Sequence, residues 1–171
     1  RNHEGPDFSK RKNLERDLNK VDKRIKHIPN LDDPVKMQQF FLTVTKGKSE
    51  EEIKMLSEIF IKNFQRAYYS DQNIGHYGLV MPRYATFTSP IRRYPDLFIH
   101  RVISDYIESG YVLSDKKIAK YATQAIEYSK TSSETEKNAT LIERDFDDLY
   151  KCIYMSKFVG DEFEAVISNV T

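Results

Sequence analysis

Residues 74–94 read IGHYGLVMPRYATFTSPIRRY, a stretch rich in glycine, proline and aromatic residues that shows no helical period. Glycine and proline interrupt regular structure, and short runs of β-branched and aromatic residues between them favour strands. The stretch therefore predicts one or two short strands and a structured loop. The sequence on both sides has a helical pattern, so this loop divides the chain.

Two helices are predicted in the N-terminal part of the chain. From Leu14 to Ile28, apolar residues recur at spacings of three and four, which is typical of an amphipathic helix. Pro29 ends it, because proline has no amide donor. Asp33 resembles an N-cap, and the proline after it suits the first position of a short helix over 34–43.

Two further helices flank the irregular stretch directly. Ser49 and Glu52 have the spacing of a capping box, and the apolar stripe behind them predicts a helix to about Tyr69. After the loop, Pro95 marks the start of a helix that Gly110 closes.

The C-terminal part is predicted to be one long helical tract over 115–158, with a break near 131–133. Gly160 is a suitable C-cap. Residues 162–168 alternate like the first strand of a new unit. The expected fold class is therefore α+β, dominated by helices.

The composition of the 171 residues is that of an ordinary soluble domain, with 39% hydrophobic and 31% charged residues. The net charge of +1 alone indicates neither a nucleic-acid binder nor an acidic substrate, although it can conceal a local patch. A single cysteine, Cys152, excludes an internal disulfide, fits a reducing cytosol, and is expected to be buried. No apolar run reaches the length of a membrane helix. Because the chain starts with Arg1 and ends at Thr171 without a terminating pattern, we interpret it as a piece of a longer protein.

Four arginines and one aspartate lie between residues 83 and 101 of this otherwise balanced chain. Arg92 and Arg93 precede a helix N-terminus, where cations are disfavoured until an anion binds. The helix amides, the guanidinium groups and the hydroxyls of Thr88 and Ser89 would suit a phosphate. Arginine suits this better than lysine, because its planar fork contacts two phosphate oxygens.

The aromatic residues Tyr84, Phe87 and Tyr94 are candidates for stacking on bases. The alternative is that Asp96 neutralises the arginines and that the aromatic rings belong to the core. The residues alone give these two interpretations equal weight.

The segment 76–101, HYGLVMPRYATFTSPIRRYPDLFIHR, resembles the hallmark segment of the ribonuclease II/R catalytic domain, with its Thr-Ser-Pro-Ile-Arg-Arg-Tyr core. RNHEGP at 1–6 and the Ile-Glu-Arg-Asp at 142–145 are similar to other motifs of that family. Residues 160–171 resemble the opening strand of the OB-fold domain that follows it. The Arg-Arg-Tyr-Pro-Asp version is closer to the ribonuclease R type, although Thr86 stands where that type often has histidine.

The resemblance implies two domains: residues 1–158 as the C-terminal part of the catalytic RNB domain, and 159–171 as the start of an OB-fold. Such enzymes degrade single-stranded RNA processively from the 3′ end to nucleoside 5′-monophosphates in the cytoplasm. They use Mg²⁺ held by aspartates, and those aspartates are not expected in this chain. We therefore expect no metal ligands here, no cofactor bound to this fragment, and no activity of the fragment alone.

The resemblance also implies site residues. Arg92 matches the arginine that contacts the reacting phosphate, and Glu143 matches a glutamate that orients the terminal nucleotide or Arg92, unless it is only an ion-pair partner. We expect structural roles for Arg101, His76 and His100. The weaker candidates for RNA contact are Tyr84, Thr88, Ser89 and Arg93.

The alternative function is a non-catalytic RNA-binding or protein-binding helical module that uses the same basic loop to hold phosphate. A helical scaffold would leave the concentration of arginines unexplained. In either case, we expect part of a larger domain to expose apolar surface, covered by the remainder of the same protein or by a second chain.

Overall fold

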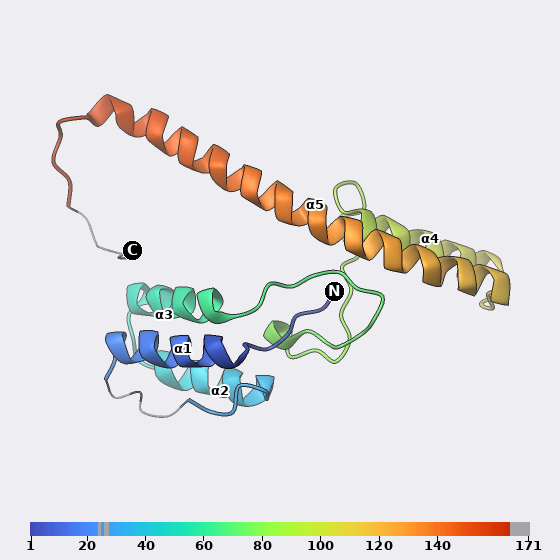
Figure 1. The fold of residues 1–171 in the computed structure, drawn as a ribbon, viewed down its shortest axis with the longest axis horizontal. Helices are drawn as coiled ribbons and strands as arrows, with labels where there is room; N and C mark the ends of the chain where they lie inside the picture. The colour runs from blue at the N-terminus through green and yellow to red at the C-terminus, as the bar shows by residue number, and fades with distance from the viewer. Residues whose placement is uncertain (24, 26–27, 165–171) are drawn as a thin grey trace. The chain divides into compact units, whose positions relative to one another are not determined.

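The computed structural model describes residues 1–23, 25 and 28–164, and their regular elements are helical (Figure 1). The elements are α1 (Phe8–Val21), α2 (Pro34–Thr45), α3 (Glu50–Asn63), the 3-10 helix η1 (Tyr77–Leu79), α4 (Tyr94–Glu108), α5 (Asp115–Met155) and the 3-10 helix η2 (Ser156–Phe158). The chain divides into two compact units, Arg1–Ser133 and Glu134–Thr171. The boundary falls within α5. The predicted dominance of helices is confirmed.

Helix α1 lies earlier than predicted. Asp7 caps its N-terminus by accepting a hydrogen bond of 2.8 Å from the amide of Lys10. The prediction that the helix reaches Ile28 is wrong, because the amide of Asp22 closes the last turn and the chain then turns away. Ile25 is still buried in the core, so a turn reproduces the apolar spacing that a longer helix would have given.

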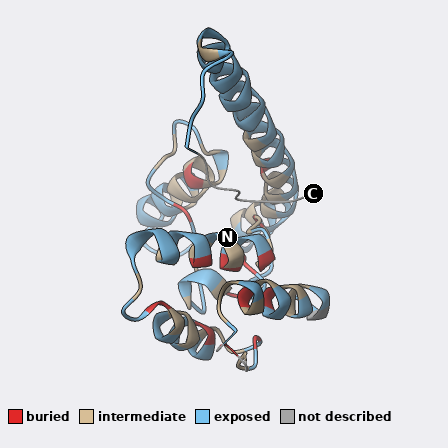
Figure 2. Cartoon of the chain, turned by 90° about the vertical axis from the view of Figure 1, so that its left-hand side faces the viewer, coloured by how far each residue is buried: buried red, intermediate tan, exposed pale blue. Residues whose placement is uncertain are grey.

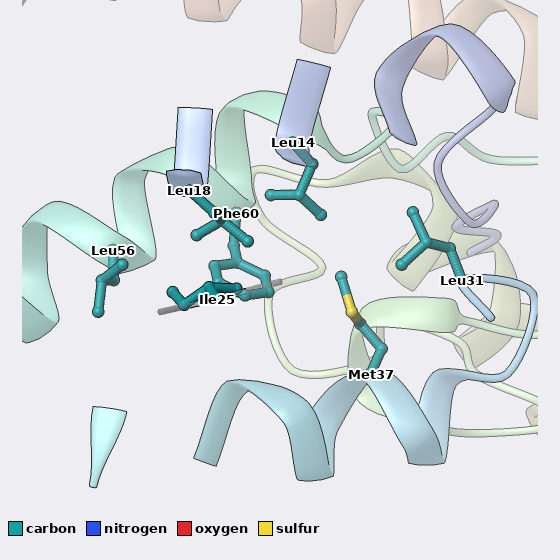
Figure 3. Close-up of a cluster of buried hydrophobic side chains, with 7 residues drawn as sticks. All are labelled: Leu14, Leu18, Ile25, Leu31, Met37, Leu56 and Phe60. Carbon is teal, nitrogen blue, oxygen red and sulfur yellow. The ribbon is translucent and has the colours of Figure 1, made fainter. Parts of the chain in front are cut away.

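The hydrophobic core of the first unit lies among α1, α2 and α3 (Figures 2 and 3). Asp33 caps α2 as predicted, by accepting hydrogen bonds from the amides of Val35 and Lys36. The buried cluster consists of Leu14, Leu18, Ile25, Leu31, Met37, Leu56 and Phe60. Burial of this apolar surface holds the three helices together.

Helix α3 begins as predicted and ends earlier than predicted. Ser49 and Glu52 form both hydrogen bonds of the capping box. The helix does not continue to Tyr69, because the backbone just before Tyr69 pairs with the N-terminal segment of the chain instead. The amide of Asn2 donates to the carbonyl of Tyr68 at 2.8 Å, and the reciprocal bond is 2.9 Å. Tertiary hydrogen bonding therefore replaces the last turns expected from the sequence.

The stretch 74–94 forms isolated bridges and η1 in place of the predicted strands. His76 bridges to His3 and to Met81. Gly75 has a φ of +84°, and a Cβ there would lie 3.1 Å from the carbonyl oxygen of Met81. Glycine is required at this position because the backbone conformation and the available space both exclude a side chain.

Helix α5 is continuous, and the predicted break at 131–133 is wrong. The hydroxyl of Ser133 donates to the carbonyl of Ser129 at 2.8 Å, and its oxygen accepts a 2.9 Å bond from the amide of Tyr69. Serine in a helix can bond to the preceding turn without breaking it. The small polar residues that suggested a break thus form a contact with the segment after α3.

The C-terminal part of α5 is exposed (Figure 2). Cys152 is exposed, so the expectation that it is buried is wrong. Residues 162–164 have no regular structure, and the rest of the predicted strand at 162–168 lies outside the described residues. Within the described part of the chain, no helix is long and apolar enough to cross a membrane.

Replacing Leu56, which is fully buried, with alanine is expected to lower the free energy of unfolding by about 2–5 kcal/mol, because the change leaves a cavity in the core. The matched control is Ile61→Ala on the same helix, whose side chain is 71% exposed and should change stability by less than about 0.5 kcal/mol. Urea unfolding followed by circular dichroism measures both. Equal losses would contradict this assignment of the core.

Candidate functional site

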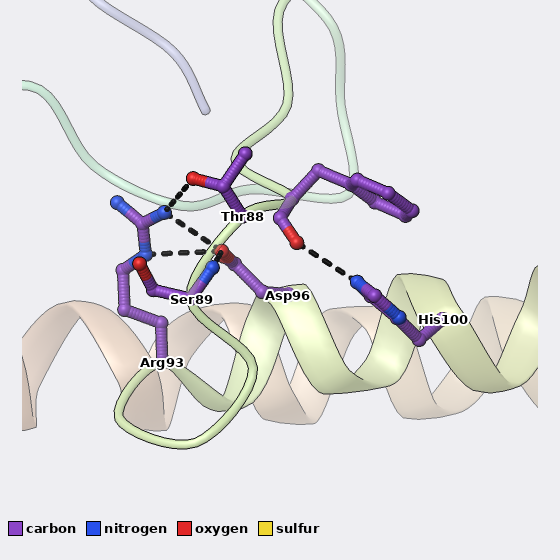
Figure 4. Close-up of polar contacts among 6 residues, drawn as sticks. Thr88, Ser89, Arg93, Asp96 and His100 are labelled. Carbon is purple, nitrogen blue, oxygen red and sulfur yellow. Dashed lines mark hydrogen bonds and ion pairs between the residues drawn. The ribbon is translucent and has the colours of Figure 1, made fainter.

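The arginine loop, which we define as residues 86–93, is tied to α4 by a buried carboxylate (Figure 4). Asp96 is 0% exposed, and its Oδ2 accepts a hydrogen bond of 2.9 Å from the amide of Ser89. The same oxygen accepts hydrogen bonds from Nε and Nη2 of Arg93 at 3.0 and 2.8 Å. One carboxylate therefore binds both the backbone of the loop and its last side chain.

A second contact joins the loop to α4 four residues further along the helix. Nε2 of His100 lies 2.8 Å from the carbonyl oxygen of Phe87, so that nitrogen carries the proton and donates it (Figure 4). The His100 ring also stacks on the Phe87 ring, with centroids 4.1 Å apart and an interplanar angle of 15°. The structural role expected for His100 is confirmed.

The two adjacent arginines of the loop are in different environments. The amides of Arg92 and Arg93 both donate to the carbonyl of Ser89, which forms a tight turn. Ile91 and Arg92 project from this turn, and Ile91 is fully exposed. Among the described residues, Arg93 has Asp96 as its ion-pair partner, whereas the Arg92 side chain makes no hydrogen bond or ion pair.

The charge of Asp96 is stabilised where it lies. Burial alone would raise the pKa of this carboxyl, but the neighbouring Thr86 hydroxyl and the hydrogen bonds from the Ser89 amide and the Arg93 guanidinium outweigh it and lower the pKa. Oδ1 of Asp96 and Oγ1 of Thr86 are both buried, and neither makes a hydrogen bond of ordinary geometry to any described residue. The Asp96–Arg93 pair is thus ionised at neutral pH.

The N-terminus of α4 has fewer free amide donors for an anion than the sequence suggested. Pro95 has no amide hydrogen, and the amides of Asp96 and Leu97 both donate to the carbonyl of Arg93. The Asp96 carboxylate also lies in the first turn, where it offsets the positive end of the helix dipole. Anion binding at this loop would therefore depend on side chains, above all on Arg92.

The aromatic candidates for base stacking also have partners within the protein. Tyr84 packs edge-on against His76 with centroids 5.0 Å apart, and Tyr94 packs against Tyr128 at 4.9 Å. Nη1 of Arg101 donates to the Tyr94 hydroxyl at 3.3 Å, in agreement with the structural role expected for Arg101. These rings therefore pack within the protein, Tyr84 before the loop and Tyr94 at the start of α4.

The N-terminal motif 1–6 contacts the residues that precede the loop. Nε2 of His3 lies 2.7 Å from the carbonyl oxygen of Gln65, and its Nδ1 accepts a 2.8 Å hydrogen bond from the amide of Gly78. This arrangement selects the neutral tautomer protonated at Nε2. A Cβ at Gly78 would lie 2.9 Å from Nδ1, so His3 needs glycine there. The His3 ring packs 4.9 Å from that of His76, whose pKa is lowered first by burial and then by the charges of nearby groups.

The second predicted catalytic residue, Glu143, lies on α5 in the second unit, whereas Arg92 lies in the first. Glu143 is exposed, and its side chain makes no hydrogen bond or ion pair with a described residue. Asp147 and Asp148 are exposed and pair with Lys151 at 3.7 and 3.6 Å, as expected for solvated charges. Across the described residues, no group of three or more His, Cys, Asp or Glu could hold a metal ion.

Asp96 and His100, which anchor the loop, were not predicted from the sequence to be part of the site. Asp96 was considered only as a neutralising charge, and His100 was given only a packing or hydrogen-bonding role. The signal was their separation by one helical turn, since residues four apart lie on the same face of a helix. The sequence could not show which loop atoms they bind.

Comparison with known proteins decides the family. The family model described as RNB domain matches residues 1–109, more than half of the chain. The chain belongs to the RNB domain family. Ribonuclease R 1 of Lactococcus lactis is 38% identical to this RNB-domain chain over 136 residues, which cover 80% of the chain and 16% of that protein. Ribonuclease R of Aquifex aeolicus is 34% identical over 168 residues, or 98% of the chain and 23% of that protein.

A solved RNB-family structure has the same fold. Ribonuclease R of Mycoplasma genitalium, in complex with ribose-methylated single-stranded RNA, aligns with a TM-score of 0.85 and 26% identity. The alignment covers 100% of this chain and 26% of that one. The chain spans about a sixth to a quarter of the length of the curated relatives it matches.

Replacing Asp96 with asparagine is expected to lower the free energy of unfolding by about 1–3 kcal/mol at pH 7, because Arg93 loses its counter-charge at a buried site. The folded-state pKa of Asp96 is below the ordinary value of 3.8, so its stabilisation is complete above that pH. It is lost as the pH falls through the lower, folded-state pKa. Urea unfolding of both proteins across this range measures the difference, and a difference independent of pH would contradict the assignment.

Proposed function

We propose that the chain is part of a 3′-to-5′ hydrolytic exoribonuclease of the ribonuclease R type, which degrades single-stranded RNA processively to nucleoside 5′-monophosphates. In this proposal, the chain supplies an arginine clamp for the scissile phosphate. The observation that carries it is Arg92, exposed and unpaired among the described residues, at the tip of a loop whose other arginine is neutralised. This loop lies within the segment matched by the RNB family.

The chemistry of Arg92 suits a phosphate undergoing attack. A guanidinium group is planar, permanently charged and able to donate two parallel hydrogen bonds to phosphate oxygens. When water attacks phosphorus, charge on those oxygens is redistributed, and a donor already in place lowers the barrier without reorganisation. Arg92 would orient the phosphate and stabilise this charge.

The remaining predicted contacts are secondary to Arg92. Thr88 is exposed in the same loop and offers a hydroxyl, and Ser89 is partly exposed. Arg93 has one nitrogen, Nη1, outside its bonds to Asp96 and Thr88. Tyr84 would contribute from the base of the loop. Glu143 would orient the terminal nucleotide or Arg92.

In this proposal, the ligands of the metal ion lie outside this segment. Among the described residues, the carboxylates do not gather into a site, so the residues present do not fit a Mg²⁺ ion. Dependence of the whole enzyme on Mg²⁺ would require aspartates elsewhere in the protein, and the segment alone would be inactive.

We further propose the domain assignment made from the sequence, with residues 1–158 in the RNB domain and 159–171 beginning an OB-fold, in a cytoplasmic enzyme. The exposed apolar residues of the second unit support coverage by the remainder of the same protein or by a second chain. These residues are Leu141, Ile142, Phe146, Leu149, Tyr150, Ile153, Tyr154 and Met155.

The second candidate function is a non-catalytic RNA-binding module. The feature that suits it is the exposed charge of Arg92, which would bind a phosphate without any catalytic group in this chain. In that case the arginine loop would only hold phosphate. The two functions differ in whether the full-length protein shortens RNA.

In the full-length protein, Arg92→Lys is expected to lower turnover by about tenfold to a thousandfold, because the charge remains but the bidentate fork is lost. The measurement is the 3′-to-5′ shortening of an end-labelled single-stranded RNA in the presence of Mg²⁺ or EDTA. The matched control is Arg101→Lys, since Arg101 contacts Tyr94 and not the loop tip.

Three results would change the conclusion. Unchanged turnover of Arg92→Lys would remove Arg92 from the reaction centre. Equal losses for Arg92→Lys and Arg101→Lys would indicate a general effect of arginine replacement. Binding of RNA without any shortening by the full-length protein would favour the non-catalytic module.

A further inference from the structure

Two side chains of α4 present complementary groups to the arginine loop. Asp96 and His100 are four residues apart, and residues at this spacing lie on one face of a helix. Asp96 offers an acceptor and His100 a donor (Figure 4). In the loop, the amide of Ser89 donates to Asp96, and the carbonyl of Phe87 accepts from His100. The two bonds thus reach residues two apart in the loop from one face of α4.

These two bonds hold the loop at Phe87 and Ser89. Thr88, between the two anchored residues, is exposed, and Arg92 projects from the turn that follows. The Arg93 side chain closes the arrangement, because it binds Asp96 and also reaches the Thr88 hydroxyl at 3.4 Å. The loop is thus held at Phe87, Ser89 and Arg93.

We propose that Asp96 and His100 are positioning residues, which hold the arginine loop in the conformation that presents Arg92 to the substrate phosphate. Neither residue contacts the substrate in this proposal, and both act through Arg92. The inference rests on the proposed exoribonuclease function and deepens it. A clamp on a short turn works only if it is held in place, since a displacement of about 1 Å can cost about a hundredfold in rate.

The test is a double-mutant cycle in the full-length protein, with Arg92→Ala, Asp96→Asn and the double variant. Asp96→Asn is expected to lower kcat about tenfold to a hundredfold, with KM changed less than about threefold. In the Arg92→Ala background the same change should cost less than about twofold, because no clamp is left to position. Asp105→Asn is the matched control. Asp105 is another α4 carboxylate of lowered pKa, but it binds Lys117 and Tyr121 instead of the loop.

The outcomes separate the two proposals. If the unaltered protein does not shorten RNA, the proposed function fails. If it does, and Arg92→Ala is impaired, an equal fold-loss from Asp96→Asn in both backgrounds would overturn the positioning role alone. So would a loss from Asp105→Asn as large as that from Asp96→Asn.

His100 provides a second test that does not require the Asp96 variant to fold. His100→Ala removes the donor to the Phe87 carbonyl and should lower kcat about tenfold. His100→Gln retains a side-chain N–H donor of similar reach and should restore most of that loss. Equal loss in the two variants, with unchanged melting temperatures, would overturn the role of His100.

Discussion

The site depends on one buried charge interaction, that between Asp96 and Arg93. A carboxylate with no exposed surface is costly unless it is paired and hydrogen-bonded, and here it receives three hydrogen bonds at a single oxygen. Those bonds come from a backbone amide before the turn and a side chain after it. The interaction that neutralises Asp96 therefore also defines the conformation of the turn. Arg92 is left outside it.

The starts of α2 and α3 could be predicted from the sequence, whereas the end of α3 and the continuity of α5 could not. Asp33 and Ser49 act within their own segments, so a local pattern is enough to place α2 and α3 at their N-termini. The end of α3 and the uninterrupted course of α5 involve partners far along the chain. The segment after α3 is drawn into pairing between Tyr68 and Asn2, and Ser133 bonds to Tyr69 without interrupting α5. Neither partner is visible in a local window.

The candidate site was predicted as a cluster of arginines with an anion or an aspartate as alternative counter-charges. The structure shows that Asp96 neutralises Arg93 and leaves the Arg92 side chain without a partner among the described residues. Anion binding by Arg92 stays a prediction. Adjacent residues in a turn point in different directions, and composition cannot tell which one faces inward. Likewise, the aromatic residue Tyr84 is suited both to stacking on a base and to packing on His76, and only the structure shows the second contact.

The different fates of the two arginines affect how ionic strength would act on this surface. Binding of single-stranded nucleic acid releases condensed counterions, and the logarithm of affinity falls with the logarithm of salt concentration by about 0.7 for each phosphate neutralised. A sequence with two adjacent arginines suggests two such contacts. Because the charge of Arg93 is already balanced by Asp96, the two arginines together would neutralise about one phosphate. The loop would then contribute little to the overall electrostatic attraction of RNA, and its value would lie in where its single free charge is placed.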